Sequence, residues 1–190
     1  YGSCSEGAAR PTNRAAERRR ARCTSDSRYR RFREWGWQMI ERLEKLVDDI
    51  TSLNSKLVLL IGPPRSGKTA LLAQLSQRRN VPVLNVGAAL GRQLLTVPST
   101  HRHLQAAELM KGLTDETARQ GLLLLDNIEL LFDRTLLLNP LDFLKRHAHA
   151  RRVICVWPGE IRDGRLSYGA AGHPEYQDYG INGLVPFEIK

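Results

Sequence analysis

Residues 57–69 of this 190-residue chain read LVLLIGPPRSGKT. The first five are apolar, which is typical of a strand buried on both faces of a sheet. Glycine and proline then mark a turn, and an apolar periodicity of three to four residues begins after Thr69. A strand, a glycine-containing turn and a helix in this order favour an α/β fold built on a parallel sheet.

Residues 62–69 match the pattern of glycine, any four residues, glycine, lysine, and serine or threonine that defines a phosphate-binding loop. Gly62 and Gly67 let the backbone approach a phosphate without a Cβ in the way. The loop N–H groups and the following helix N-terminus attract anions. Lys68 is expected against the β- and γ-phosphates, and the Thr69 hydroxyl on Mg²⁺. The residues expected to contact ATP are Gly62, Pro63, Pro64, Arg65, Ser66, Gly67, Lys68, Thr69 and Ala70.

A second part of the site is predicted at Asp126, which ends the apolar run LLLLD over residues 122–126. Open α/β sheets bind ligands at the carboxyl ends of their strands. Asp126 would therefore help to hold Mg²⁺, together with Thr69, in the role of a Walker-B aspartate. The structural alternative is a helix N-cap, because both Asp126 and Asn127 suit that position.

Hydrolysis of ATP is expected, but its catalytic base is less plainly marked. In ATPases with an extra strand between the phosphate-loop and Walker-B strands, a glutamate commonly follows the aspartate; here that position is Asn127, which cannot act as a base. Glu129 is the candidate base beside Lys68 and Asp126, and the alternative is a first-turn helix acid. The fourth strand ends without a polar γ-phosphate sensor, so turnover is expected to be slow or dependent on a partner. An arginine finger supplied by a neighbouring molecule could fill this gap, and the candidates, each with a surface charge as its alternative, are Arg134, Arg146, Arg151 and Arg152.

The rest of the chain completes a three-layer P-loop NTPase fold with a mostly parallel five-stranded sheet. An amphipathic helix is predicted from Glu34 to Leu53. Further strands are predicted at 81–86, 152–157 and 166–168, the first weakened or placed at an edge by Pro82. Further helices are predicted at 69–77, 87–95, 101–120 and 140–150. Too few residues follow the last predicted strand for a helical lid domain.

The charge is concentrated at the amino end. The chain has 29 Lys and Arg against 20 Asp and Glu, a net charge of +9. Residues 1–33 hold ten Arg against three acidic residues, so they carry +7 and leave +2 for residues 34–190. We predict a disordered basic extension over 1–33, able to contact DNA, and a nucleotide-binding domain over 34–190. No apolar run could span a bilayer, and three scattered cysteines fit a reducing, cytoplasmic setting.

Several stretches together resemble a known family. They are residues 57–72, 122–132 (LLLLDNIELLF), 139–144 (NPLDFL), 153–160 (VICVWPGE) and 166–176 (LSYGAAGHPEY). In combination they resemble the small P-loop ATPase of bacteriophage-exclusion (BREX) defence systems, the BrxF type. The resemblance implies an ATP-binding, ATP-hydrolysing accessory protein that acts with larger antiviral defence proteins against phage DNA.

Two other classes of function remain open on the sequence alone. One is a P-loop phosphotransferase, although neither an arginine-rich lid nor an acceptor pocket is evident in the sequence. The other is a DNA-binding adaptor whose nucleotide site is only structural. A nucleotide-dependent homo-oligomer is also compatible with the sequence.

Overall fold

The computed structural model describes residues 36–53, 55–169 and 172–189. Contacts divide the chain into two units, 1–39 and 40–190. The extension predicted over 1–33 lies outside the described residues. Residues 36–49 are helical, and the 3₁₀ turn η1 (Ile50–Ser52) comes directly after them. The strands and the other helices all belong to residues 40–190.

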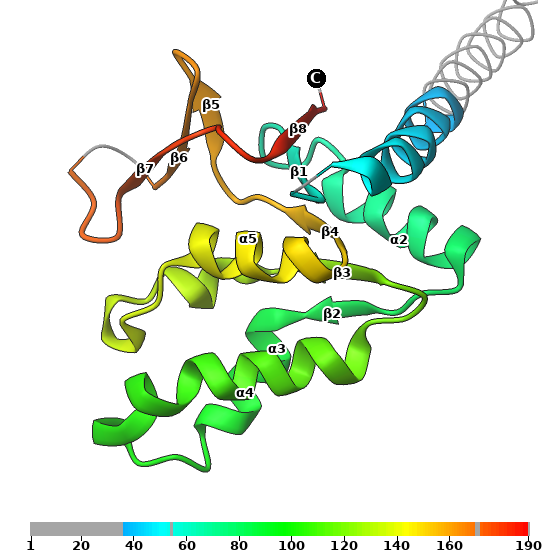
Figure 1. The fold of residues 1–190 in the computed structure, drawn as a ribbon. Helices are drawn as coiled ribbons and strands as arrows, with labels where there is room; N and C mark the ends of the chain where they lie inside the picture. Colours follow the sequence, from blue (N-terminus) through cyan, green and yellow to red (C-terminus); the bar gives the residue numbers. More distant parts are fainter. Residues whose placement is uncertain (1–35, 54, 170–171, 190) are drawn as a thin grey trace, which may run out of the picture. The chain divides into compact units, whose positions relative to one another are not determined.

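The larger sheet has five strands, and every neighbouring pair in it is parallel (Figure 1). In spatial order the strands are β2 (Val83–Asn85), β3 (Leu122–Asp126), β4 (Arg152–Val156), β1 (Leu57–Ile61) and β8 (Val185–Glu188). The sheet confirms the predicted α/β class. Strand β4 lies between β1 and β3, so the two strands that lead to the predicted site are not direct neighbours.

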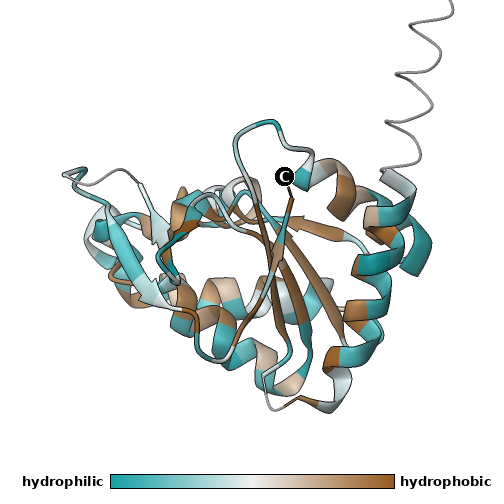
Figure 2. Ribbon diagram, turned by 90° about the horizontal axis from the view of Figure 1, so that it is seen from above, coloured by the Kyte–Doolittle hydropathy of each residue, from teal (hydrophilic) through white to brown (hydrophobic). Residues whose placement is uncertain are grey.

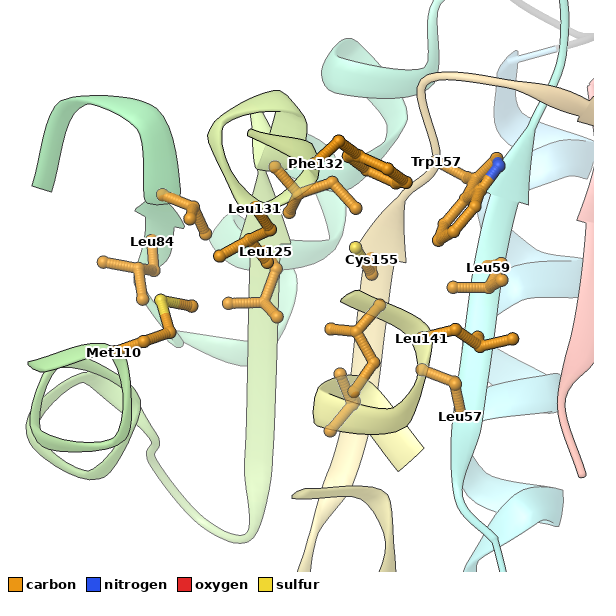
Figure 3. Packing of buried hydrophobic residues seen from close by; sticks show 14 of the residues in the cluster. Leu57, Leu59, Leu84, Met110, Leu125, Leu131, Phe132, Leu141, Cys155 and Trp157 are labelled. Carbon is orange, nitrogen blue, oxygen red and sulfur yellow. The ribbon is translucent and has the colours of Figure 1, made fainter. Parts of the chain in front are cut away.

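Helices lie against both faces of this sheet. They are α2 (Lys68–Arg79), α3 (Val86–Leu94), α4 (Arg102–Thr117) and α5 (Pro140–Ala150), with the 3₁₀ turns η2 (Ser99–His101), η3 (Ile128–Phe132) and η4 (Arg134–Leu136). One core cluster joins alternate strand residues, such as Leu59, Leu125 and Cys155, to α3, α4 and α5 (Figure 3). The strand residues between them are also fully buried, as expected for a sheet covered on both sides. The strands are accordingly coloured as hydrophobic in Figure 2.

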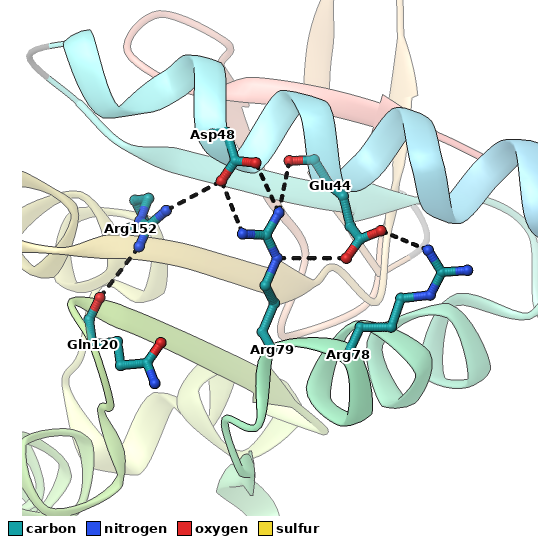
Figure 4. A network of polar contacts seen from close by, with 6 residues as sticks. All are labelled: Glu44, Asp48, Arg78, Arg79, Gln120 and Arg152. Carbon is teal, nitrogen blue, oxygen red and sulfur yellow. Dashed lines mark hydrogen bonds and ion pairs between the residues drawn. The ribbon is translucent and has the colours of Figure 1, made fainter.

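The second face of the sheet is covered by α2 and by helical residues 40–49, which an ion-pair network connects (Figure 4). Arg79 donates hydrogen bonds to both carboxylate oxygens of Asp48, at 3.1 and 2.8 Å. Arg78 pairs with Glu44 at 2.7 Å, and Arg152 lies 3.6 Å from Asp48. The Arg79 hydrogen bond, together with the charges of Arg79 and Arg152, lowers the pKa of Asp48. This network ties the carboxyl end of α2 to the preceding helix.

A second, smaller sheet was not predicted. It is antiparallel and contains β5 (Glu160–Arg162), β6 (Arg165–Tyr168) and β7 (Gln177–Gly180). The prediction that residues 166–168 form the fifth strand of the main sheet is therefore wrong, because that place belongs to β8. Residues 163 and 164 form the tight turn between β5 and β6, both with positive φ. Asp-Gly is the typical sequence of such a hairpin turn.

Aromatic side chains hold the smaller sheet on the main core. Trp157 is fully buried, and its Nε1 donates a 2.9 Å hydrogen bond to the carbonyl of Ser167 in β6. Phe132 contacts Trp157 edge-on at a centroid distance of 5.3 Å and stacks on Tyr168 at 3.7 Å. Tyr179 of β7 meets Trp157 edge-on at 5.9 Å. Edge-on and stacked ring pairs are favourable arrangements, so the central strand β6 and the outer strand β7 are both anchored by side chains.

Most predicted elements are observed with shifted ends. β3 and α5 have the predicted bounds, whereas α2 and α4 each differ from the prediction by one to three residues at an end. β2 is shorter than predicted because it begins after Pro82, and it lies at the edge of the sheet as the proline suggested. Within the described part of the chain, no helix has the length and apolar character needed to cross a membrane.

Candidate functional site

A cleft of about 1190 Å³ lies at the carboxyl ends of β1, β3 and β4. Its walls come from the loop between β1 and α2, from the chain after β3, and from the smaller sheet. The loop contributes Gly62, Lys68 and Thr69, and the chain after β3 contributes Asp126 and Glu129. The predicted magnesium and catalytic residues therefore meet at one opening with Gly62, Pro63 and Pro64, whereas the other predicted phosphate contacts, Arg65, Ser66, Gly67 and Ala70, do not line it.

The loop between β1 and α2 requires its two glycines for different reasons. At Gly62 a Cβ would lie 2.5 Å from the carbonyl oxygen of Ile189 and 2.8 Å from Ser66 Oγ, so no side chain fits there. Gly67 has φ of 88°, in the left-handed region, and a Cβ there would meet nothing within 4 Å. Backbone geometry alone thus favours glycine at 67, and the space beside it is open.

Lys68 lies across the loop that it follows. Its Nζ donates hydrogen bonds to the carbonyls of Gly62, at 2.5 Å, and Pro63, at 3.0 Å. Burial lowers the pKa of the Lys68 ammonium, and the negative charges of Asp126 and Glu129 act in the opposite direction. Lys68 therefore holds the loop in shape while its charge faces two carboxylates across the cleft.

The beginning of α2 is suited to an anion. Gly67 is the N-cap and offers no side-chain acceptor to the first-turn N–H groups, which lack partners within a helix. Thr69 and Ala70 are exposed in this turn. Ser66 Oγ is buried without a hydrogen-bond partner beside them. Unpaired donors and an unpaired hydroxyl are what a bound phosphate would satisfy.

Asp126 is a buried acid at the end of β3, with only 5% of its surface exposed. Its Oδ1 accepts the N–H of Asn127 at 2.9 Å. Asn127 adopts a left-handed conformation with φ of 52°, and it is Asn127, not Asp126, that occupies the N-cap position of η3. The N-cap alternative for Asp126 is therefore wrong. A buried carboxylate that faces a cleft at a strand end is better placed to bind a cation than to cap a helix.

Glu129 lies in the first turn of η3 and lines the cleft. The left-handed turn at Asn127 brings the chain back toward the opening. The charge of Glu129 contributes to shifts in the pKa values of Lys68, which lines the cleft, and of Cys155 and Tyr168, which do not. The first-turn helix acid is confirmed by its position, and the place of Glu129 in the cleft wall is compatible with the predicted catalytic base, which stays a prediction.

The arginines predicted as candidate fingers lie elsewhere in this chain. Arg151 pairs with Asp115 at 2.5 Å, and Arg152 pairs with Asp48. Both are at the amino end of β4, opposite the cleft. Arg134 donates to the carbonyl of Pro174, and Arg146 is exposed on α5. None of the four lines the cleft of its own chain, so a finger given to a neighbouring molecule stays a prediction.

Sequence reasoning missed the residues that the smaller sheet brings to the cleft. They are Glu160, Arg162, Asp163, Arg165, Ser167 and Asp178. The sequence EIRDGRLSY over 160–168 alternates polar and apolar residues around Asp-Gly, which is a strong hairpin signal. This alternation around Asp-Gly is sufficient to predict the hairpin.

Comparisons with protein-family models, with curated proteins and with solved structures found no match for this chain. Its function is therefore inferred from the geometry of the cleft and from the sequence pattern.

Proposed function

We propose that this chain is a P-loop ATPase that binds ATP with Mg²⁺ in the cleft and acts as an accessory protein of a bacterial BREX-type antiphage system. The observation that carries the ATP proposal is the meeting of Lys68, Thr69 and Asp126 at one opening beside a glycine-shaped loop. The link to phage defence is supported by the sequence resemblance alone.

In this proposal the loop and the first turn of α2 bind the phosphates. The Lys68 ammonium donates hydrogen bonds to two loop carbonyls in this structure. When ATP binds, it would donate to phosphate oxygens in place of these carbonyls. The Ser66 hydroxyl gains the partner that it lacks. Backbone N–H groups from residues 67–70 add further donors.

Thr69 and Asp126 would hold Mg²⁺. Among the described residues there is no group of three or more His, Cys, Asp or Glu side chains that could hold a metal. Mg²⁺ in nucleotide sites is typically held by one or two protein ligands together with substrate phosphates, so this pair fits it. The ion would supply positive charge against the phosphates during transfer.

Glu129 is the proposed general base. Its carboxylate lines the same cleft and can accept a proton from a water aimed at the γ-phosphate, whereas the Asn127 amide cannot. Because η3 is a short 3₁₀ turn, a small rotation of its first turn would change how far Glu129 reaches into the cleft. This would make turnover sensitive to a bound partner.

The proposal is tested by Lys68→Ala, with Lys111→Ala as the matched control. Lys111 is exposed on α4, outside the cleft. We expect Lys68→Ala to weaken Mg·ATP binding at least about ten-fold, since a charged hydrogen-bond donor is lost, and Lys111→Ala to bind like the parent. Calorimetric titration measures both. Parental ATP affinity in Lys68→Ala would contradict the nucleotide proposal.

The defence role needs a separate test in cells. A strain that carries the complete defence locus is complemented with the parent chain or with Lys68→Ala, and phage plating efficiency is measured. We expect protection only with the parent chain. Equal protection by both would contradict an ATP-dependent role in defence, whatever the binding assay shows.

A further inference from the structure

The two faces of the smaller sheet have opposite chemistry. Side chains alternate between faces along a strand, and directly paired residues share a face. Ile161, Leu166, Tyr168 and Tyr179 pack against the core on one face. The other face carries Glu160, Arg162, Arg165, Ser167 and Asp178, all of which line the cleft. The whole polar face therefore forms a wall opposite the phosphate loop.

Two arginines of this wall are placed side by side. Arg162 and Arg165 are direct partners across the β5–β6 hairpin, on either side of its two-residue turn (Figure 1). Like charges in directly opposed positions repel, so each arginine needs an anion. In this structure Arg162 pairs with Glu160 at 2.7 Å and Arg165 pairs with Asp178 at 2.5 Å.

Among the described residues that line the cleft, the cationic ones are Lys68, Arg162 and Arg165. A nucleoside triphosphate brings several negative charges into a cleft that is also lined by the carboxylates of Asp126, Glu129, Glu160, Asp163, Asp178 and Glu188. The Arg162 and Arg165 side chains remain 75% and 56% exposed in their ion pairs, and exposed pairs of this kind are weak. A polyphosphate can therefore displace their carboxylate partners, since guanidinium and phosphate form strong bidentate contacts.

We propose that Arg162 and Arg165 form an arginine clamp that binds the polyphosphate of the nucleotide from the side opposite Lys68. Glu160 and Asp178 neutralise this clamp when the cleft holds no nucleotide. The inference rests on the proposed nucleotide site and adds to it a second set of phosphate ligands, supplied by the same chain. It gives the smaller sheet a function in selecting triphosphates over monophosphates.

The test measures Mg·ATP and AMP affinities of the full chain by calorimetry, with thermal unfolding as a check of folding. The variants are Arg162→Ala and Arg165→Ala, with Arg92→Ala on α3, an exposed arginine outside the cleft, as the control. We expect each clamp variant to weaken ATP binding about ten-fold and to leave AMP binding within two-fold of the parent. Removal of a competing carboxylate in Glu160→Gln is expected to tighten ATP binding by roughly two- to five-fold.

The outcomes separate this inference from the function on which it rests. ATP affinity within two-fold of the parent in both clamp variants, with binding lost in Lys68→Ala, overturns the clamp and leaves the nucleotide site standing. Equal losses for ATP and AMP overturn the assignment to the polyphosphate. Failure of the parent chain to bind ATP overturns both proposals together.

Discussion

The substitution Gly159→Ala tests how the smaller sheet is attached to the rest of the fold. Gly159 lies between Trp157 and β5, where the chain leaves the main sheet. A Cβ on this residue would overlap the carbonyl oxygen of Ser167 and would lie 2.7 Å from its carbonyl carbon and 2.9 Å from Trp157 Nε1. The obstructing atoms are mainly backbone, so no side-chain rotation can relieve the overlap.

The size of the effect depends on which atoms must move. The Ser167 carbonyl carbon must move by about 0.7 Å to go from 2.7 Å to an ordinary contact of 3.4 Å, and the carbonyl oxygen, which overlaps the Cβ, must move farther. The 2.9 Å hydrogen bond from Trp157 to Ser167 would then be broken or strained, leaving a buried indole N–H without a partner. Overpacking costs about 1–3 kcal/mol and an unpaired buried donor about 1–3 kcal/mol, so we expect a loss of about 2–6 kcal/mol. At about 2–4 °C per kcal/mol for a domain of this size, that lowers the unfolding temperature by roughly 4–24 °C.

The assay is thermal unfolding followed by circular dichroism, with hydrogen exchange of the β5–β7 amides as a local measurement. The matched control is Gly112→Ala in α4, where a Cβ would meet nothing within 4 Å. Alanine is a better helix former than glycine, so this control is expected to gain about 1 kcal/mol. An unfolding temperature of Gly159→Ala within 1 °C of the parent, with unchanged exchange in β5–β7, would refute the reasoning.

Two further predictions concern the catalytic and electrostatic residues. Glu129→Gln is expected to lower ATP turnover by about 100-fold or more while ATP affinity stays near the parental value, because only proton acceptance is lost; turnover equal to that of the parent excludes Glu129 as the base. Asp48 has a pKa lowered by the Arg79 hydrogen bond, so its stabilising contribution is present above its unfolded pKa, near 3.8, and is lost as pH falls through the lower folded value. Unfolding temperatures from pH 7 to pH 3 should therefore show that Asp48→Asn is less stable than the parent near neutrality and that the difference shrinks in acid. A difference that does not change with pH would contradict this account.

The parts of the fold that could be predicted from sequence are those with one strong local pattern. Residues 122–126 and 140–150 have the predicted bounds because an unbroken apolar run and a proline at the first helical turn mark their ends plainly. β8 could not be predicted in the same way. Its sequence, VPFE, is short and contains proline, and it becomes a strand by pairing with β1, more than 120 residues earlier in the chain. Such long-range pairing leaves little trace in local sequence.

The same distinction between local patterns and long-range contacts applies to the residues of the candidate site. Lys68, Thr69 and Asp126 were predictable because residue type and spacing carry their chemistry. The polar wall of the cleft could not be predicted in this way. The positions of Arg162 and Arg165 follow from side-chain alternation in β5 and β6 only once it is known that the apolar face of these strands packs on the core. The sequence contains the local signal for the hairpin. It does not indicate that the apolar face of the hairpin packs against the aromatic rings around Trp157, because that contact arises only in the tertiary structure.

The position of β4 explains why these two halves of the site meet. Because β4 lies between β1 and β3, the end of β3 is two strand spacings, about 10 Å, from the end of β1. The chain that leaves β4 must therefore emerge between the phosphate loop and Asp126. Trp157 turns into the core at this point, and Pro158 and Gly159 lead the chain along the cleft into β5. A hairpin attached here has one face held by the core and the other turned to the cleft. The central strand thus supplies both the gap in which we propose that a nucleotide binds and the wall that faces this gap.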